Sequence, residues 1–147
     1  MKTQNEMKLT FQSLSVNEGF ARSAVASFIS MLDPTVSEIA DIKTAVSEAV
    51  TNCIVHAYRD SVGVIYIHTK ILEDRRVLIK IRDRGCGIED VEKAMEPLFT
   101  TQSENERSGL GFSVMQSFCD KVKVKSKLNK GTSVLLEKRL SQKEKIK

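Results

Sequence analysis

Residues 47–58 read SEAVTNCIVHAY, and two glycine-rich segments follow them, DRGCG at 83–87 and SGLG at 108–111. With Gly131, these segments hold five of the seven glycines in the chain. Glycines used so sparingly usually stand where the backbone adopts a positive φ or passes close to another group. An acid and an amide on one helix, followed by two glycine turns, indicate a pocket for a magnesium–nucleotide complex.

Length and composition predict one globular domain over residues 1–147. The chain is 41% hydrophobic and 29% charged, which is typical of globular proteins. Its longest uncharged stretch is the twelve residues Ser108–Cys119, well below the roughly 20 that span a bilayer. The start of the chain has no apolar signal segment, so we expect a cytoplasmic protein without a membrane partner. Cys53, Cys86 and Cys119 lack metal-ligand spacing and are predicted to be reduced thiols.

Charge is concentrated near the end of the sequence. Residues 120–147 carry ten Lys or Arg and three Asp or Glu, a net charge of +7. Such a segment can contact nucleic acid. However, Lys121, Lys123, Lys125 and Lys127 alternate with apolar or small residues, as they would on a half-buried strand. We therefore favour a solvated strand face followed by a basic tail at about 141–147, and expect no direct binding to nucleic acid.

The first half of the chain predicts a strand and two helices. The strand covers Glu6–Leu14. Ser15–Glu18 matches a capping box and starts a helix that ends at Asp33-Pro34. Thr35–Glu38 is a second capping box, which starts a long helix that ends near residues 58–60. The apolar positions of the first helix follow helical spacing: Phe20, Ala24, Val25, Phe28, Ile29 and Leu32.

The second half predicts two hairpins and two shorter helices. These are strands Val62–Ile71 and Arg76–Asp83, helices Glu89–Met95 and Gly109–Asp120, and strands Lys121–Leu128 and Thr132–Leu140. The irregular segment at about 88–108, between the glycine motifs, indicates a functional flap. This order of elements predicts an α+β fold: a two-layer α/β sandwich with helices on one face of a mostly antiparallel sheet.

Glu48 and Asn52 are one helical turn apart, so they share a face of the long helix. The amide oxygen of an Asn is a ligand suited to Mg²⁺, which keeps several waters and phosphate oxygens. A neighbouring carboxylate can accept a proton from an attacking hydroxyl. The pair alone is common by chance, and two ordinary exposed side chains remain an alternative.

Asp83 ends an apolar strand. A carboxylate at that place can accept a hydrogen bond from an exocyclic amine such as that of adenine, and Gly85 and Gly87 would let the chain turn beneath a flat base. A plain turn that closes the strand is the alternative.

Gly109 and Gly111 precede a predicted helix, whose free N–H groups attract phosphate. Arg107 could add a charge-assisted contact to a terminal phosphate. The surrounding sequence has neither the βαβ unit of a Rossmann fingerprint nor the Gly-Lys-Ser/Thr of a Walker loop. An ordinary loop before a helix is the alternative.

Together and in this order, the motifs resemble those of the Bergerat-fold family: gyrase B, Hsp90, MutL and the ATP-binding domains of histidine kinases. The resemblance implies that Asn52 binds Mg²⁺, that Asp83 binds the adenine amino group, and that Thr132 lies beside the base. It implies ATP or ADP as ligand, with a lid at about 88–108 that closes over the phosphates. The remaining nucleotide contacts that it implies are Gly85, Gly87, Thr100, Thr101, Ser108, Gly109, Leu110 and Gly111.

Residues 47–58, and PLFTT at 97–101 running to ERSGLGF at 106–112, are most similar to the sporulation group of anti-sigma factor serine kinases. That resemblance implies a homodimer that binds a sigma factor when it holds ATP and phosphorylates a serine of an anti-anti-sigma protein. It makes Glu48 the base, with Arg107 on the γ-phosphate. Cys53 and Cys86 stand where small residues would serve equally.

Other functions remain open from the sequence. The chain could be a general stress-type anti-sigma kinase, or a nucleotide-gated binding module without kinase turnover. Arg22, polar among apolar neighbours, could meet an acidic partner or be an ordinary solvated position. A histidine-kinase fragment fits less well, because His56 and His68 lack the helical hairpin that carries a phosphoacceptor.

Overall fold

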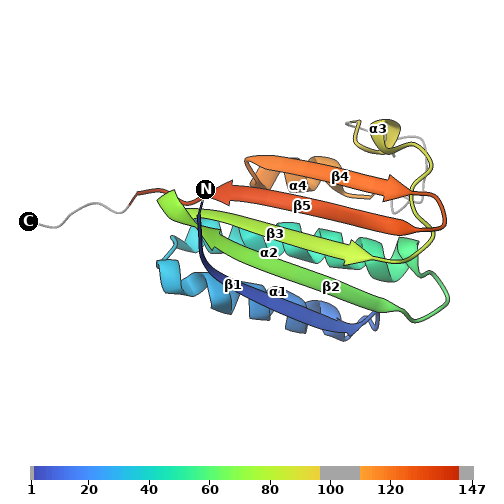
Figure 1. The fold of residues 1–147 in the computed structure, drawn as a ribbon, viewed down its shortest axis with the longest axis horizontal. Helices are drawn as coiled ribbons and strands as arrows, with labels where there is room; N and C mark the ends of the chain where they lie inside the picture. The colour runs from blue at the N-terminus through green and yellow to red at the C-terminus, as the bar shows by residue number, and fades with distance from the viewer. Residues whose placement is uncertain (1, 97–109, 143–147) are drawn as a thin grey trace, which may run out of the picture.

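The computed structural model describes residues 2–96 and 110–142. Five antiparallel strands form one sheet in the order β1-β2-β3-β5-β4. Helices α1, α2 and α4 lie together behind this sheet in the view of Figure 1, which makes two layers. The predicted α+β sandwich is confirmed. The strands are β1 (Thr3–Gln12), β2 (Val64–Leu72), β3 (Arg76–Asp83), β4 (Lys121–Lys127) and β5 (Gly131–Arg139). The α-helices are α1 (Asn17–Ile29), α2 (Val36–Thr51), α3 (Val91–Ala94) and α4 (Phe112–Phe118).

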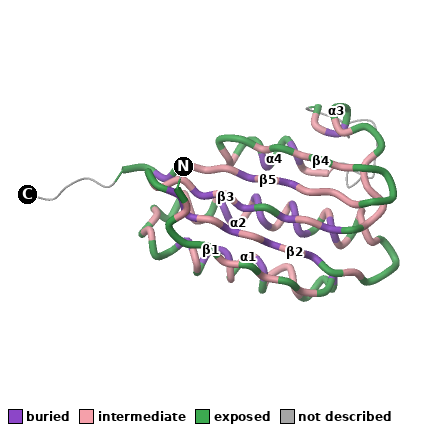
Figure 2. Tube along the Cα trace, in the orientation of Figure 1, coloured by how far each residue is buried: buried purple, intermediate pink, exposed green. Residues whose placement is uncertain are grey.

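Side-chain alternation along the strands separates a buried face from an open one. In β2, Ile65, Ile67 and Thr69 are buried, while the residues between them are half-buried. Successive side chains of a strand point to opposite faces, so the buried set faces the helices. It meets Val25, Ile29, Ile42, Val46 and Val50 of α1 and α2 in one core. Figure 2 shows the buried positions, in purple, recurring along the strands and along the helices behind them.

The first predicted capping box is wrong. Helix α1 begins at Asn17, and Val16 at its N-cap makes no side-chain cap bond. The carboxylate of Glu18 instead accepts a hydrogen bond from the Ser47 hydroxyl and pairs with Arg22 at 3.5 Å. A tertiary contact with α2 therefore occupies the Glu18 carboxylate, which the predicted capping box would have used. Phe20, predicted on the apolar face, is 53% exposed and packs edge-on against Phe11.

The second capping box is confirmed. Thr35 accepts a hydrogen bond from the Glu38 amide at 3.0 Å, and Glu38 accepts one from the Thr35 amide at 2.9 Å. Helix α2 then runs into a π-helical turn, η2 (Asn52–Ala57). The sequence predicted one continuous helix to residues 58–60, because the wider turn leaves no mark on the apolar spacing. π-Helical turns are rare and frequent at functional sites.

The later helices are shorter than predicted. Helix α3 covers four residues, and α4 begins at Phe112 after Gly111, which has φ +68°. The strand predictions hold within two residues at most ends, although β1 begins and ends earlier than expected. Two short 3₁₀ turns, η1 (Ser30–Leu32) and η3 (Glu73–Arg75), close α1 and the β2–β3 hairpin. Most of the predicted lid, from residue 97 on, and most of the basic tail lie outside the described residues. No helix in the described ranges is long and apolar enough to cross a membrane.

Thr35→Ala should lower the free energy of unfolding by about 1 kcal/mol, because it removes the oxygen that caps α2. Urea unfolding followed by circular dichroism measures the change. Thr44→Ala is the matched control, since the Thr44 hydroxyl only bonds back to the Ala40 carbonyl within the same helix and Ala has the higher helix propensity. Equal losses in both variants would contradict the capping role.

Candidate functional site

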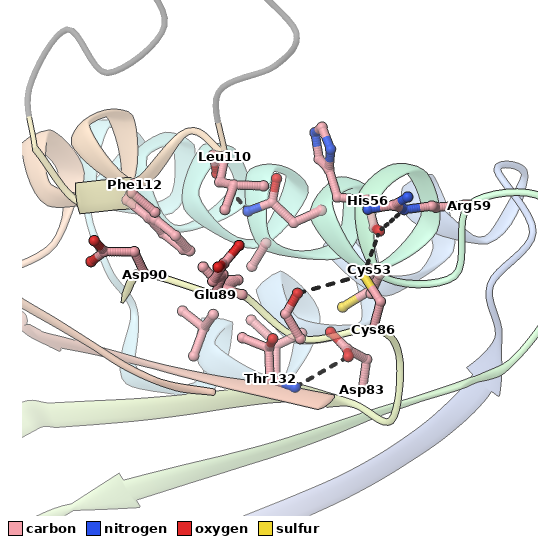
Figure 3. Close-up of a pocket in the computed structure, with 18 of the residues that line it drawn as sticks. Cys53, His56, Arg59, Asp83, Cys86, Glu89, Asp90, Leu110, Phe112 and Thr132 are labelled. Atoms are coloured by element: carbon pink, nitrogen blue, oxygen red, sulfur yellow. Dashed lines mark hydrogen bonds between the residues drawn. The ribbon is translucent and has the colours of Figure 1, made fainter. Parts of the chain in front are cut away.

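A cavity of about 640 Å³ lies between η2, the ends of β3 and β5 that pair Asp83 with Thr132, and the segment from Cys86 to Ala94. Figure 3 shows Asp83 and Thr132 on the strand side and Leu110 and His56 on the opposite side. This volume is within the range of small-molecule sites. Its walls are Ala49, Asn52, Cys53, His56, Ala57, Arg59, Ile81, Asp83, Cys86, Gly87, Ile88, Glu89, Asp90, Lys93, Ala94, Leu110, Phe112, Thr132 and Val134.

Asp83 is the buried carboxylate of this cavity, with 6% of its surface exposed. Its Oδ1 accepts hydrogen bonds from the Gly85 amide at 2.9 Å and from the Thr132 amide at 3.2 Å. Burial raises the pKa of Asp83, and these hydrogen bonds only partly offset the rise. The neighbouring Cys53 thiol also lowers the pKa of this carboxyl group. The carboxyl group of Asp83 is therefore a hydrogen-bond acceptor held at a fixed position in a mostly apolar pocket.

Gly85 and Gly87 are required by contacts within the chain. A Cβ at Gly85 would come within 2.5 Å of the Ala57 carbonyl oxygen, and one at Gly87, where φ is +78°, would collide with the Lys127 carbonyl. The Cys86 amide meanwhile donates to Ala57 at 3.0 Å. The glycines thus let the segment after β3 pack against η2 and β4. Gly87 also lines the cavity, whereas Gly85 acts through its amide on Asp83.

Asn52, the first residue of η2, lines the cavity on the side opposite β3. Its amide nitrogen donates a hydrogen bond to the Leu110 carbonyl. This bond ties the helix to the segment before α4, and it leaves the amide oxygen of Asn52 as an acceptor.

Glu48 lies one turn before Asn52, beside the cavity and not among its lining residues. Its carboxylate is next to Gly111, where a Cβ would collide with Oε1. Gly111 is therefore favoured by its positive φ, and a side chain there would also displace the Glu48 carboxylate. Partial burial raises the pKa of Glu48, which makes this carboxylate a better proton acceptor than an exposed one.

The structure brings together most of the described residues that the sequence selected. Asn52, Asp83, Gly87, Leu110 and Thr132 line one cavity. Glu48, Gly85 and Gly111 stand directly behind its wall. The other selected residues, Thr100, Thr101, Arg107, Ser108 and Gly109, lie outside the described ranges.

Sequence reasoning missed several wall residues. The two cysteines were treated as replaceable, yet Cys53 lies beside Asp83 and affects its pKa, and the Cys86 thiol reaches the His56 carbonyl at 3.4 Å. Burial raises the pKa of Cys53 well above its ordinary value, so this thiol stays protonated and can donate. Lys93 is a cation on the wall. Its only sequence signal was its place in the predicted flap.

The chain is similar to known proteins over nearly its whole length. A family model described as the histidine kinase-like ATPase domain matches residues 13–138. The chain is 58% identical to an anti-sigma F factor of Caldanaerobacter subterraneus subsp. tengcongensis, over 94% of this chain and 96% of that protein. It is 52% identical to the anti-sigma F factor of Clostridium acetobutylicum over the same shares. The motif resemblance to anti-sigma F factors is thereby confirmed.

Two solved structures have the same fold. A Mycobacterium tuberculosis chain with RsbU and RsbW domains superposes with a TM-score of 0.70 at 20% identity, over 95% of this chain. This chain spans only 34% of that larger one. The catalytic domain of the histidine kinase ThkA superposes with a TM-score of 0.56 at 18% identity, over 91% of this chain and 96% of that domain.

Asp83→Asn should be at least as stable as the unchanged protein at neutral pH. The pKa of Asp83 is higher in the folded protein than its ordinary value of 3.8. Ionising Asp83 therefore lowers the free energy of unfolding. This loss is absent below the pKa of the unfolded chain and complete above the pKa of the folded protein. An amide carries no such cost and can still accept from Gly85 and Thr132. The advantage of the variant should therefore grow from about pH 4 to about pH 7.

Urea unfolding across that pH range, with Asp60→Asn at an exposed turn as control, tests this expectation. An Asp83→Asn variant that loses stability as pH rises would contradict it.

Proposed function

The chain belongs to the histidine kinase-like ATPase family, and from this premise we propose that it is a nucleotide-dependent anti-sigma factor and a serine protein kinase that uses Mg·ATP. The family model implies ATP or ADP as ligand. The names of the 50–58% identical relatives support a sigma factor as partner. The main support for nucleotide binding is the buried Asp83 carboxylate, which lines one cavity together with Asn52 and Thr132.

Asp83 would select adenine. Its Oδ1 already takes two backbone N–H groups, which fixes the plane of the carboxyl group, and its charged form accepts a hydrogen bond from an exocyclic amine. A site built to hydrogen-bond one group rejects ligands that lack it, because its buried polar atom would be left unpaired. Thr132 is paired with Asp83 across the β3–β5 ladder and would lie beside the base.

Asn52 would hold the metal. The donor set fits Mg²⁺, since this ion takes one or two protein oxygens and completes its shell with phosphates and water, and the Asn52 oxygen stays available after its nitrogen binds Leu110. Bound Mg²⁺ would neutralise phosphate charge during transfer. Lys93 lines the same cavity and would add a positive charge near the phosphates, together with Arg107 of the proposed lid.

Glu48 would be the base that accepts the proton of the substrate serine. Its raised pKa and its place one turn from Asn52 support this role. Phosphoryl transfer depends mainly on positioning and charge neutralisation, so few protein groups are needed.

The start of α1 is the proposed sigma-factor surface. Val16 and Phe20 lie one turn apart and are 77% and 53% exposed, and Leu14 before them is 45% exposed. Exposed apolar groups of this kind mark protein-binding surfaces. Glu18 connects this region to α2, because it binds both Arg22 and Ser47, the neighbour of Glu48. We propose that nucleotide occupancy reaches Arg22 through this link, in a cytoplasmic homodimer that also uses the edge strand β1.

Glu48→Gln should reduce serine phosphorylation by about 10²–10⁴-fold, because a general base contributes a factor of that size. Mg·ATP binding should remain, since the carboxylate stands behind the cavity wall. The measurement is transfer of labelled γ-phosphate to an anti-anti-sigma protein from the same genome, with nucleotide binding by calorimetry. Glu73→Ala, on an exposed turn, is the control, and full transfer by Glu48→Gln would rule out the base assignment.

Asn52→Ala in the same assay should lose magnesium-dependent ATP binding as well as transfer. If the unchanged protein binds Mg·ATP but labels no serine, a nucleotide-gated sigma binder without kinase turnover becomes the better function.

Affinity for the sigma factor should be at least about tenfold higher with Mg·ATP than with ADP or no nucleotide, which corresponds to a coupling of about 1.4 kcal/mol. Glu18→Gln should reduce this ratio, because it breaks the link between Ser47 and Arg22. Biolayer interferometry with the purified sigma factor measures both, and equal affinity in all three nucleotide states would sink the gating proposal.

A further inference from the structure

The face of the sheet turned away from the helices, called here the open face, carries a strong positive charge. In the view of Figure 1 this face is turned toward the reader. Residues paired across an antiparallel ladder share a face, which defines two rows that cross all five strands. One row is Lys8, His68, Lys80, Leu135 and Lys123, and the next is Thr10, Tyr66, Arg82, Ser133 and Lys125.

Acidic side chains are confined to one end of the open face. Glu6 and Glu137 occur in the row beyond Lys8 and Lys80, and both are already bonded, to His68 at 2.6 Å and to Arg76. At the other end of the open face, Arg84 and Lys127 lie two residues beyond Arg82 and Lys125 and add two more cations. The end of the open face that holds Lys80, Arg82 and Lys125 therefore combines several cations with no acid in either row.

Two shallow grooves cross this cationic end. The first, of about 400 Å³, is lined by Lys8, Leu9, Thr10, Tyr66, Ile67, His68, Lys80 and Arg82. The second, of about 370 Å³, is lined by Arg82, Asp83, Arg84, Lys125, Ser126, Lys127, Lys130, Gly131, Thr132 and Ser133. They share Arg82, so they form one track from β1 to β4. Its only acid, Asp83, is buried and bonded to Gly85 and Thr132.

A stack of Tyr66 with two guanidinium groups, held by cation–π contacts, lies in the middle of this track. Tyr66 is paired with Arg82 across the β2–β3 ladder. The Arg82 guanidinium carbon is 4.3 Å from the centre of the Tyr66 ring, and that of Arg84 is 5.3 Å away. Aromatic rings and guanidinium planes are the surfaces on which unstacked nucleic-acid bases stack.

We propose that the cationic track on the open face binds single-stranded nucleic acid. Side chains two apart on a strand are about 6.6 Å apart, so Lys123, Lys125 and Lys127 present charge at regular steps to a phosphate backbone. The Tyr66–Arg82 stack supplies a platform for one or two bases. A charged groove combined with a stacking platform is how proteins bind single strands without sequence preference.

Charge and shape disfavour other occupants. A second copy of the chain would bring two cationic faces together. A protein partner needs an apolar interface core, from which Lys is depleted, and Leu135 is the one aliphatic side chain in the two rows. A duplex exposes stacked bases that a flat sheet cannot reach. The sequence alone favoured a plain solvated strand face for the β4 lysines. The tertiary structure adds Lys80 and Arg82 of the internal strand β3, where edge protection gives no reason for cations. Lys8 joins them from β1, the other edge strand.

Fluorescence anisotropy with labelled 12-mers of oligouridylate and oligothymidylate, against the full chain, tests the proposal. We expect a Kd of about 10⁻⁶–10⁻⁴ M, and a slope of log affinity against log salt near −4, because about six phosphates contribute about −0.7 each. A matched duplex, polyglutamate and phosphatidylglycerol vesicles are the competitors. Tighter binding of any competitor, or no binding of either oligonucleotide at low salt, would overturn the proposal.

Variants place the binding on the track. Lys80→Gln with Lys125→Gln should weaken binding at least about tenfold and flatten the salt slope by about 1.4. Lys43→Gln, on α2 in the other layer, should change neither. Tyr66→Leu should weaken binding at least about fivefold while Tyr66→Phe retains it, because only the leucine removes the stacking surface. Unchanged thermal midpoints and Mg·ATP binding exclude misfolding, and equal effects of the Lys43 and Lys80/Lys125 changes would refute the assignment.

Discussion

The carboxylate of Asp83 is the constraint on which the rest of the site depends. It is buried at the end of β3, where it receives amide hydrogens from its own turn and from β5 and lies beside Cys53 of η2. Three elements far apart in the sequence thus meet at one acceptor. The burial that raises its pKa opposes folding at neutral pH, as is usual for groups kept for function.

The π-helical turn η2 brings both Asn52 and the segment after β3 to the cavity that holds Asp83. It follows α2 without a break, so Asn52 keeps the direction that the core packing of α2 gives it, while the wider turn presents the Ala57 carbonyl to the Cys86 amide. Gly85 and Gly87 permit that approach because side chains there would strike Ala57 and Lys127. The glycines of the first motif are therefore explained by packing of chain on chain, and their place at a ligand pocket follows from it.

The two faces of the sheet have separate tasks. The inner face packs on the helices and leaves the cavity at one end. Among the residues that the structure describes, no helix covers the open face, and its alternation collects cations from β1, β3 and β4 into one track. One protein can thus combine a nucleotide cavity and a polyanion surface without sharing side-chain faces, since strand period two assigns neighbouring residues to opposite sides.

The sequence by itself determined the strands, the α2 cap and the grouping of Glu48, Asn52 and Asp83, because apolar periodicity, capping chemistry and sparse glycines act over a few residues. Only the tertiary structure decided the outcome at Ser15, because the Ser47 hydroxyl donates to Glu18, and the position of the Glu48 carboxylate next to Gly111. It also decided that Cys53 and Asp83 line one cavity and that Lys80 and Lys125 share one face of the sheet. These contacts join residues more than twenty positions apart, and no local pattern carries information about such distant partners.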